Sequence, residues 1–78
     1  MARKTFKKIL DLCFGEEDYI ELHSELISLE VEVKRKRDYR WGVDQAYAAI
    51  PLYTDDFPEE TMEEIELLYE DYIYSLEN

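Results

Sequence analysis

The largely apolar residues near the C-terminus recur at helical spacing, and this periodicity is the strongest constraint on the fold. Placing the residues after Pro58 at 100° intervals puts one set on a single arc: Thr61, Met62, Ile65, Leu68, Tyr69, Tyr72 and Leu76. Pro58 suits the first turn of a helix, and the preceding Asp55 and Asp56 supply oxygens that can cap it. We therefore predict a long helix from Pro58 to Ser75 with this arc as its core face.

Two further elements are predicted nearer to the N-terminus. Residues 4–14 form an amphipathic helix whose apolar face lies at i, i+3, i+4 and i+7: Phe6, Ile9, Leu10 and Cys13. Residues 27–33 alternate strictly between apolar and polar side chains, which predicts a strand. The buried face of this strand consists of Ile27, Leu29, Val31 and Val33.

The remaining segments are less clearly patterned. Residues 16–26 suit a short helix or turn, because acids lie at their start, but an extended segment fits them as well. A second strand is expected within residues 39–53, with Gly42 marking a bend, although the alanines of this segment also favour a helix. These elements predict a single α+β domain over residues 1–78, with an N-terminal helix, a small antiparallel sheet and a long acidic C-terminal helix packed across it.

The charged residues are divided unequally between the two halves of the chain. All nine Lys and Arg residues lie in residues 1–40 together with nine acids, whereas residues 41–78 hold eleven acids and no Lys or Arg. The net charge of −11 therefore belongs to the C-terminal half. Such asymmetry indicates an acidic interaction surface, although acids that serve only solubility would give a similar total.

The acids of the predicted C-terminal helix fall on the arc opposite to its core face. Glu59–Glu63, Glu60–Glu64 and Glu66–Glu70 are like-charge pairs at i, i+4, and the helix contains no Lys to compensate them. Leu67 and Tyr74 emerge among these acids, either as ordinary exposed residues or as contact anchors. The predicted partner-binding residues are Asp55, Asp56, Glu59, Glu60, Glu63, Glu64, Glu66, Leu67, Glu70, Asp71 and Tyr74.

The basic run Lys34–Arg37, followed by Tyr39, Arg40 and Trp41, admits several interpretations. Basic residues interleaved with aromatic ones are typical of nucleic-acid binding, but a net charge of −11 opposes a phosphate backbone. The run can instead pair with the acidic half of the same chain, or with that of a second copy in a homodimer. The simplest interpretation is an exposed edge strand whose charges prevent edge-to-edge pairing.

No sequence pattern predicts catalysis. The chain contains no glycine-rich phosphate loop, nucleophile elbow, zinc-binding helix motif or calcium loop. Cys13 lies on the apolar stripe of the first helix, so a reactive pair with His23 is not expected. Because no apolar run has the length of a membrane span and no secretory signal is seen, we expect a soluble, cytoplasmic, non-enzymatic domain without a cofactor, a metal or a membrane partner.

The carboxylates of the predicted helix are spaced much like the phosphates of DNA. Seven carboxylates lie between Glu59 and Asp71, over about 18 Å of helix at ~1.5 Å per residue. This is about one charge per 2.6 Å, between the ~1.7 Å of duplex DNA and the ~3.4 Å of one strand. We therefore predict an inhibitor whose acidic face occupies the nucleic-acid groove of a basic DNA-binding protein, without binding nucleic acid itself.

In its size and in the acidic segment from Asp55 to Asp71, the chain resembles the small acidic DNA-mimic inhibitors of bacteriophages. These include host-takeover proteins that block the histone-like HU protein, as well as anti-restriction and anti-CRISPR proteins. The basic run Lys34–Arg37 departs from this pattern. The resemblance implies a phage origin, action in the host cytoplasm, and a DNA-binding host target such as a nucleoid-associated protein.

Two other classes of function remain as alternatives. An acidic protein-interaction module, such as an adaptor, a toxin-neutralising partner or a transcription regulator, would bind a basic protein patch without mimicking DNA. The two classes differ in whether DNA competes for the same partner. A third interpretation is a small nucleic-acid binder that uses residues 34–40.

Overall fold

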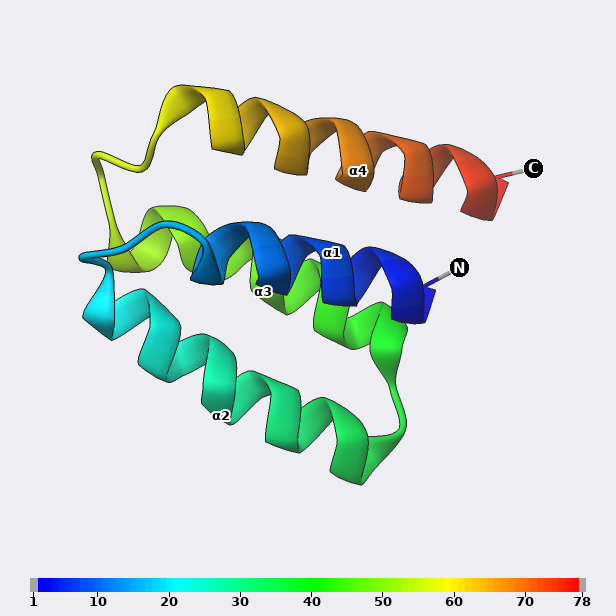
Figure 1. The fold of residues 1–78 in the computed structure, drawn as a ribbon. Helices are drawn as coiled ribbons and strands as arrows, with labels where there is room; N and C mark the ends of the chain where they lie inside the picture. Colours follow the sequence, from blue (N-terminus) through cyan, green and yellow to red (C-terminus); the bar gives the residue numbers. More distant parts are fainter. Residues whose placement is uncertain (1, 78) are drawn as a thin grey trace.

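The computed structural model describes residues 2–77, with side chains described for residues 2–76, and every regular element in this range is an α-helix. The helices are α1 (Ala2–Phe14), α2 (Ile20–Lys36), α3 (Tyr39–Tyr53) and α4 (Glu59–Glu77). Successive helices run antiparallel, so the start of α1 and the end of α4 lie at the same end of the molecule (Figure 1). The domain is flattened, with extents of 36 × 28 × 18 Å.

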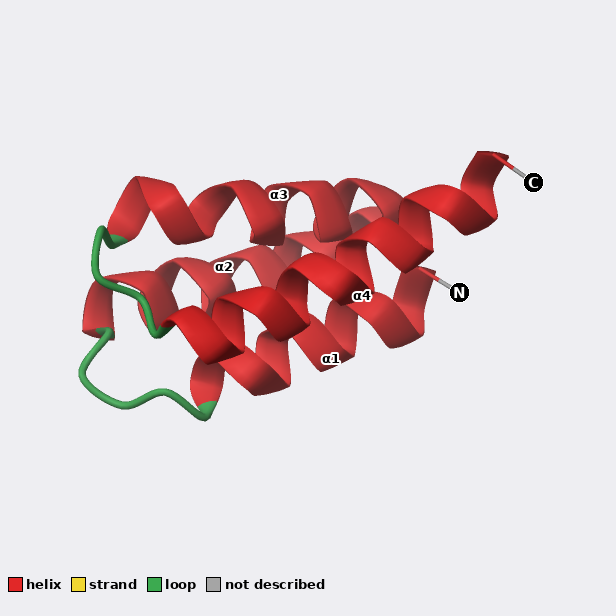
Figure 2. Cartoon of the chain, turned by 90° about the horizontal axis from the view of Figure 1, so that it is seen from above, coloured by secondary structure: helices red, strands yellow, loops and turns green. Residues whose placement is uncertain are grey.

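The four helices are not equivalent in their packing. α1 and α3 occupy the middle of the bundle, and α2 and α4 flank them (Figures 1 and 2). α3 packs against both α1 and α2, whereas α4 packs mainly on α1. Within residues 2–77, α2 and α4 do not contact each other. The outer sides of α2 and α4 therefore face opposite sides of the molecule.

Apolar residues at helical spacing build the core. The predicted apolar face of α1 is confirmed, since all four of its residues are buried. The C-terminal helix is also confirmed as α4: Ile65 and Tyr72 are fully buried, and most of the predicted arc is at least partly covered. Leu76 is the exception, because it is exposed near the end of the helix. None of the helices in the described part of the chain is long and apolar enough to cross a membrane.

The predicted α+β fold is wrong, and the strand expected over residues 27–33 is part of α2. Its alternating pattern arises from two helical stripes on opposite sides of one helix. Ile27 and Val31 lie on the outer side and are exposed. The buried stripe consists of residues at i, i+4, i+7 and i+11: Leu22, Leu26, Leu29 and Val33. Along residues 27–33, members of the outer and the buried stripe take turns at every second position. Apolar residues therefore recur with a period of two, which is the period of a strand.

The second strand expected within residues 39–53 is also a helix, α3. The Asp38 carboxylate accepts a hydrogen bond from the Trp41 backbone N–H at 3.0 Å and so caps the N-terminus of α3. Pro51 lies in the last turn, and the helix ends two residues later at Tyr53. No strand is present in residues 2–77, so the basic run does not protect the edge of a sheet.

Gly42 does not mark a bend but lies in the first turn of α3, where three helices meet. A Cβ atom at this position would lie 2.6 Å from Val33 Cγ2 and 3.1 Å from two ring atoms of Phe6. Any side chain here would therefore overlap with residues of α1 and α2. Glycine permits the close approach of these helices to α3.

The loop ends of the helices differ in detail from the sequence prediction. The segment 16–26 divides at Tyr19, after which α2 begins. The Pro58 carbonyl accepts a hydrogen bond from the Met62 N–H at 2.9 Å, so Pro58 is the N-cap of α4 and not part of its first turn. Asp55 and Asp56 lie upstream and do not cap the helix. The Asp56 carboxylate instead accepts a hydrogen bond from the Thr54 hydroxyl at 2.9 Å.

Candidate partner-binding surface

The orientation of α4 is set by contacts on its inner side. Ile65 and Tyr72 are fully buried in the core. The Tyr69 ring stacks on Tyr47 of α3, and the Tyr69 hydroxyl donates a hydrogen bond to the Asp44 carboxylate at 2.9 Å. These contacts determine which side of α4 faces solvent.

All predicted partner-binding residues are exposed, on the outer side of α4 or in the loop that precedes it. Together they form what we call the acidic face, which consists of Asp55, Asp56, Glu59, Glu60, Glu63, Glu64, Glu66, Leu67, Glu70, Asp71 and Tyr74. The face is a strip along the helix and not a compact cluster. Its loop aspartates and Tyr74 are separated by most of the ~28 Å length of α4.

The carboxylates of the acidic face are not neutralised by the basic residues of the first half. The two ion pairs among the described residues, Lys34–Glu30 and Arg35–Glu32, both lie within α2. The hydrogen bond from Arg35 lowers the pKa of Glu32. Lys36 lies over the ring of Trp41, with its Nζ 4.1 Å from the ring centroid. The basic run is thus engaged with α2 and α3, and the negative charge of α4 stays exposed.

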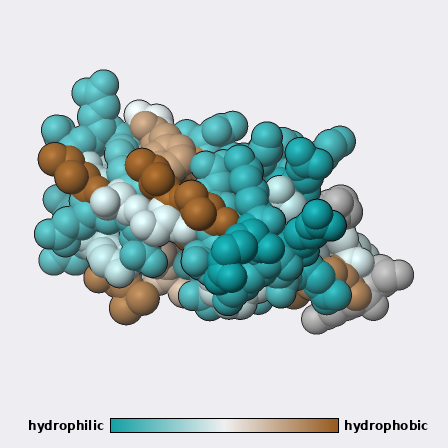
Figure 3. Space-filling view, turned by 90° about the horizontal axis from the view of Figure 1, so that it is seen from below, coloured by the Kyte–Doolittle hydropathy of each residue, from teal (hydrophilic) through white to brown (hydrophobic). Residues whose placement is uncertain are grey.

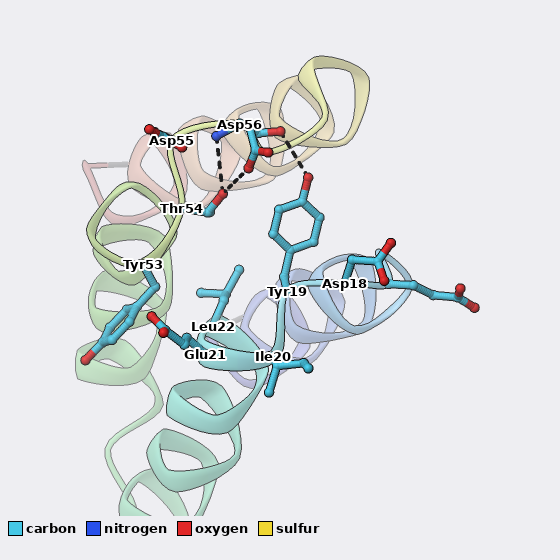
Figure 4. A pocket seen from close by; sticks show the side chains of 10 residues that line it. Asp18, Tyr19, Ile20, Glu21, Leu22, Tyr53, Thr54, Asp55 and Asp56 are labelled. Atoms are coloured by element: carbon cyan, nitrogen blue, oxygen red, sulfur yellow. Dashed lines mark hydrogen bonds between the residues drawn. The ribbon is translucent and has the colours of Figure 1, made fainter.

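The antiparallel topology adds a group of acids that sequence reasoning had not assigned to the site. Glu17, Asp18 and Glu21 line an open cavity of about 540 Å³ together with Asp55 and Asp56 (Figure 4). The α1–α2 loop and the α3–α4 loop lie at the same end of the bundle (Figure 2). A four-helix interpretation of the sequence would have placed these acids together, because alternate loops of such a bundle meet at one end.

Tyr19 ties these two loops together. Its hydroxyl donates a hydrogen bond to the Asp56 backbone carbonyl at 3.0 Å (Figure 4), and its ring lies 5.2 Å from that of Phe57. Desolvation of the hydroxyl raises the pKa of Tyr19, and the charges of Asp56, Glu16 and Asp18 raise it further. The contact holds the start of α4 beside the acids of the α1–α2 loop.

Two shallow grooves run beside the acidic face. On the α1 side, Leu67 and Leu68 meet Leu12 and Lys8 in a groove of about 440 Å³. On the α3 side, a groove of about 720 Å³ has an apolar lining of Tyr47, Ile50, Pro51, Phe57 and Met62. Carboxylates stand at both grooves: Glu64 and Asp71 on the first, and Asp55 and Glu66 on the second. Apolar surface is therefore available next to the charges.

The single cysteine and the single histidine of the chain contribute to the packing of the helices. The Cys13 thiol is fully buried, and burial raises its pKa to about 12, so it stays protonated near neutral pH. His23 Nε2 donates a hydrogen bond to the Cys13 backbone carbonyl at 2.9 Å. The acceptor of this bond is the backbone oxygen and not the thiol. Among the described residues, no group of three or more His, Cys, Asp and Glu side chains is arranged to hold a metal ion.

Comparisons with known proteins return no match. No family model, no curated protein and no solved structure matches this chain. The function proposed below therefore rests on the geometry and charge of the chain itself.

Proposed function

We propose that the acidic face binds the cationic groove of a DNA-binding protein and excludes DNA from it. The observation that supports this proposal most directly is the row of exposed carboxylates along α4, none of which forms an ion pair within the described residues. Like charges at i, i+4 destabilise a helix by a few tenths of a kcal/mol per pair. A cationic partner relieves this repulsion, which gives the uncompensated charge a role in binding.

The mechanism is competitive occlusion of the groove. The carboxylates take the positions of phosphates on the Lys and Arg side chains of the partner, so DNA and this protein cannot occupy the groove together. Complementary potentials accelerate the encounter and make it sensitive to salt. The acids at the loop end, such as Asp18 and Glu21, extend the negative potential beyond α4.

Short-range apolar contacts contribute to binding in addition to the charges. Leu67 stands exposed among the carboxylates of α4, and the groove between α3 and α4 offers an apolar lining. Interfaces derive much of their binding energy from such anchors inside a polar rim. These grooves also favour the alternative function, an acidic interaction module that seats an apolar side chain of a basic protein without mimicking DNA.

Competition with DNA is the experiment that separates the two functions. A fluorescently labelled duplex is bound to purified HU, and its anisotropy is followed as this protein is added at low salt. Mimicry predicts that the duplex is released and that release weakens as salt is raised. If HU does not bind, partners are captured from a bacterial lysate, eluted with salt, and tested in the same assay. Binding that leaves the duplex in place contradicts mimicry and supports the interaction module.

A charge-reversal variant tests the assigned face. The triple replacement Glu63→Lys, Glu66→Lys and Glu70→Lys is expected to weaken competition on the order of 10- to 100-fold. Each change removes an attraction of up to ~1 kcal/mol and adds a repulsion. The matched control reverses Glu25, Glu30 and Glu32 of α2, which lie outside the acidic face and the loop-end acids, so both variants carry a net charge of −5.

This control distinguishes an effect of where the replaced charges lie from an effect of the net charge of the protein. If both triple variants lose competition equally, net charge alone governs binding and the acidic face is not the site. Retained competition in a correctly folded α4 variant likewise contradicts the proposal. Far-UV circular dichroism verifies the fold, which is expected to persist because all three α4 positions are exposed.

A further inference from the structure

The outer side of α2 carries an apolar stripe that the core does not use. Ile20, Ile27 and Val31 are 81%, 57% and 61% exposed and lie at i, i+7 and i+11, which is one line along the helix. Ser24 occupies the intervening i+4 position and is also exposed. Figure 3 views the molecule from the α2 side and shows apolar side chains gathered within a hydrophilic surface. Spacings of four and seven residues are those of helices that pack against another helix.

Charge is polarised along the same helix. Glu16, Glu17 and Asp18 precede its N-terminus, whereas its C-terminal end carries Lys34, Arg35, Lys36 and Arg37. A second α2 that packs antiparallel brings the basic end of each helix to the acidic end of the other. A parallel arrangement places like charges together. The charges at the two ends of α2 thus favour the antiparallel orientation.

We infer that a second copy of this chain covers the stripe, with the two α2 helices antiparallel about a two-fold axis. One register matches the apolar stripe along its whole length. It places Ile20 against the partner's Val31, and Ser24 against the partner's Ile27. The same register brings Lys34 past the start of the partner's α2, to the loop that holds Glu17. The small Ser24 side chain leaves room for the isoleucine, which permits the usual interaxial distance of ~8–10 Å.

The position of α2 makes this dimer compatible with the net charge of the chain. α4 lies on the other side of the bundle, so the two acidic faces point away from each other and stay exposed. The inference does not depend on the proposed function. A single pair of 17-residue helices buries less than the ~1,200 Å² of a standard interface, so we expect a weak dimer that exchanges with the monomer.

Sedimentation velocity of the full chain over a range of concentrations tests the inference. The mass is expected to rise with concentration from 9.4 kDa towards twice that value. Ile27→Glu is expected to weaken dimerisation at least tenfold, because it puts a charge at the centre of the stripe. Leu67→Glu is the matched control, since Leu67 is similarly exposed at 61% but lies on α4. A monomer at every concentration overturns the inference, as does an Ile27→Glu variant that dimerises like the wild type.

A charge swap tests the orientation without altering the apolar stripe. Glu17→Lys alone and Lys34→Glu alone are each expected to weaken the dimer by a few fold. The double variant restores it, because both ends of the symmetric interface then carry a reversed but complementary pair. Failure of the double variant to regain the wild-type affinity overturns the antiparallel register. Competition with DNA for HU is expected to be unchanged in Ile27→Glu, so failure of this inference is distinguishable from failure of the proposed function.

Discussion

The ring of Tyr47 in α3 lies parallel to that of Tyr69 in α4, with 4.2 Å between centroids and 6° between planes. α3 and α4 pack against each other only slightly, and α4 is otherwise held on α1. The stacked pair, together with the hydrogen bond from the Tyr69 hydroxyl to Asp44, therefore restrains the rotation of α4. It fixes the direction in which the carboxylates point.

Replacement of Tyr47 by leucine removes the stack and keeps an apolar side chain at this position. We expect the free energy of unfolding to fall by about 0.5–1.5 kcal/mol, the contribution of an aromatic pair beyond its burial. Urea denaturation followed by circular dichroism measures the change. Tyr53→Leu is the control, because Tyr53 is exposed and its hydroxyl donates a hydrogen bond to the Glu25 carboxylate at the surface. Equal losses in the two variants would contradict a special role for the stack.

Gly42→Ala is expected to destabilise the fold by about 1–2 kcal/mol, although alanine is the better helix former. The added methyl group would overlap with Val33 Cγ2, and Val33 is a stiff, fully buried side chain that has no room to withdraw. Gly15→Ala is the matched control, since a Cβ atom there meets only ordinary contacts at 3.4 and 3.5 Å. Thermal unfolding compares the two. A Gly42→Ala variant as stable as Gly15→Ala would show that the helices can separate at little cost.

The sequence predicts the first and last helices well because the buried residues of each form one continuous apolar stripe. α1 and α4 each bury one side, so the period of their apolar residues is unambiguous. α2 carries two stripes, and the outer one, with Ile27 and Val31, turned a helical pattern into an alternating one. The ion pairs Lys34–Glu30 and Arg35–Glu32 have helical spacing and were the signal that could have corrected this prediction.

The part of the candidate site that lies on α4 could be predicted from the sequence. The part formed by two loops could not, because it depends on how the helices are arranged. Exposure of the α4 carboxylates follows from their position opposite the apolar arc. The approach of Glu17 and Asp18 to Asp55 and Asp56 follows only from the antiparallel order of four helices. Because residues 16–26 had no clear pattern, the sequence did not show where the second element begins and did not place these two loops side by side.

Alkaline pH is expected to destabilise the protein through its buried thiol. Burial raises the pKa of Cys13 from 9.0 to about 12, so the native state favours the protonated form. This contribution is fully present below about pH 9 and is lost above it, at about 1.4 kcal/mol per pH unit up to about pH 12. The hydrogen bond to Asp44 and desolvation raise the pKa of Tyr69, which acts in the same direction.

Urea denaturation at several pH values measures this dependence, with Cys13→Ala as the comparison. The variant is expected to be less stable at neutral pH, because it leaves a cavity in the core. Its stability should then decline less steeply than that of the wild type between about pH 9 and 12. Parallel declines would mean that the thiol does not ionise on unfolding, and would contradict the assignment to Cys13.

The repulsion within the acidic face is expected to lower the stability of the fold, while its charge promotes binding of the basic partner. One substitution changes these two properties in opposite directions. Glu59 and Glu63 are exposed one turn apart on α4 and repel each other. Glu63→Lys replaces this repulsion by an attraction in the favourable order, with the acid N-terminal to the base, so we expect a gain of about 0.5 kcal/mol at low salt. The gain should shrink at high salt as the charges are screened. Competition with DNA for the basic partner should weaken at the same time, whereas Glu30→Lys on α2 should leave competition nearly unchanged. A Glu63→Lys variant that gains stability and keeps full competition would show that the repulsion along α4 serves no partner.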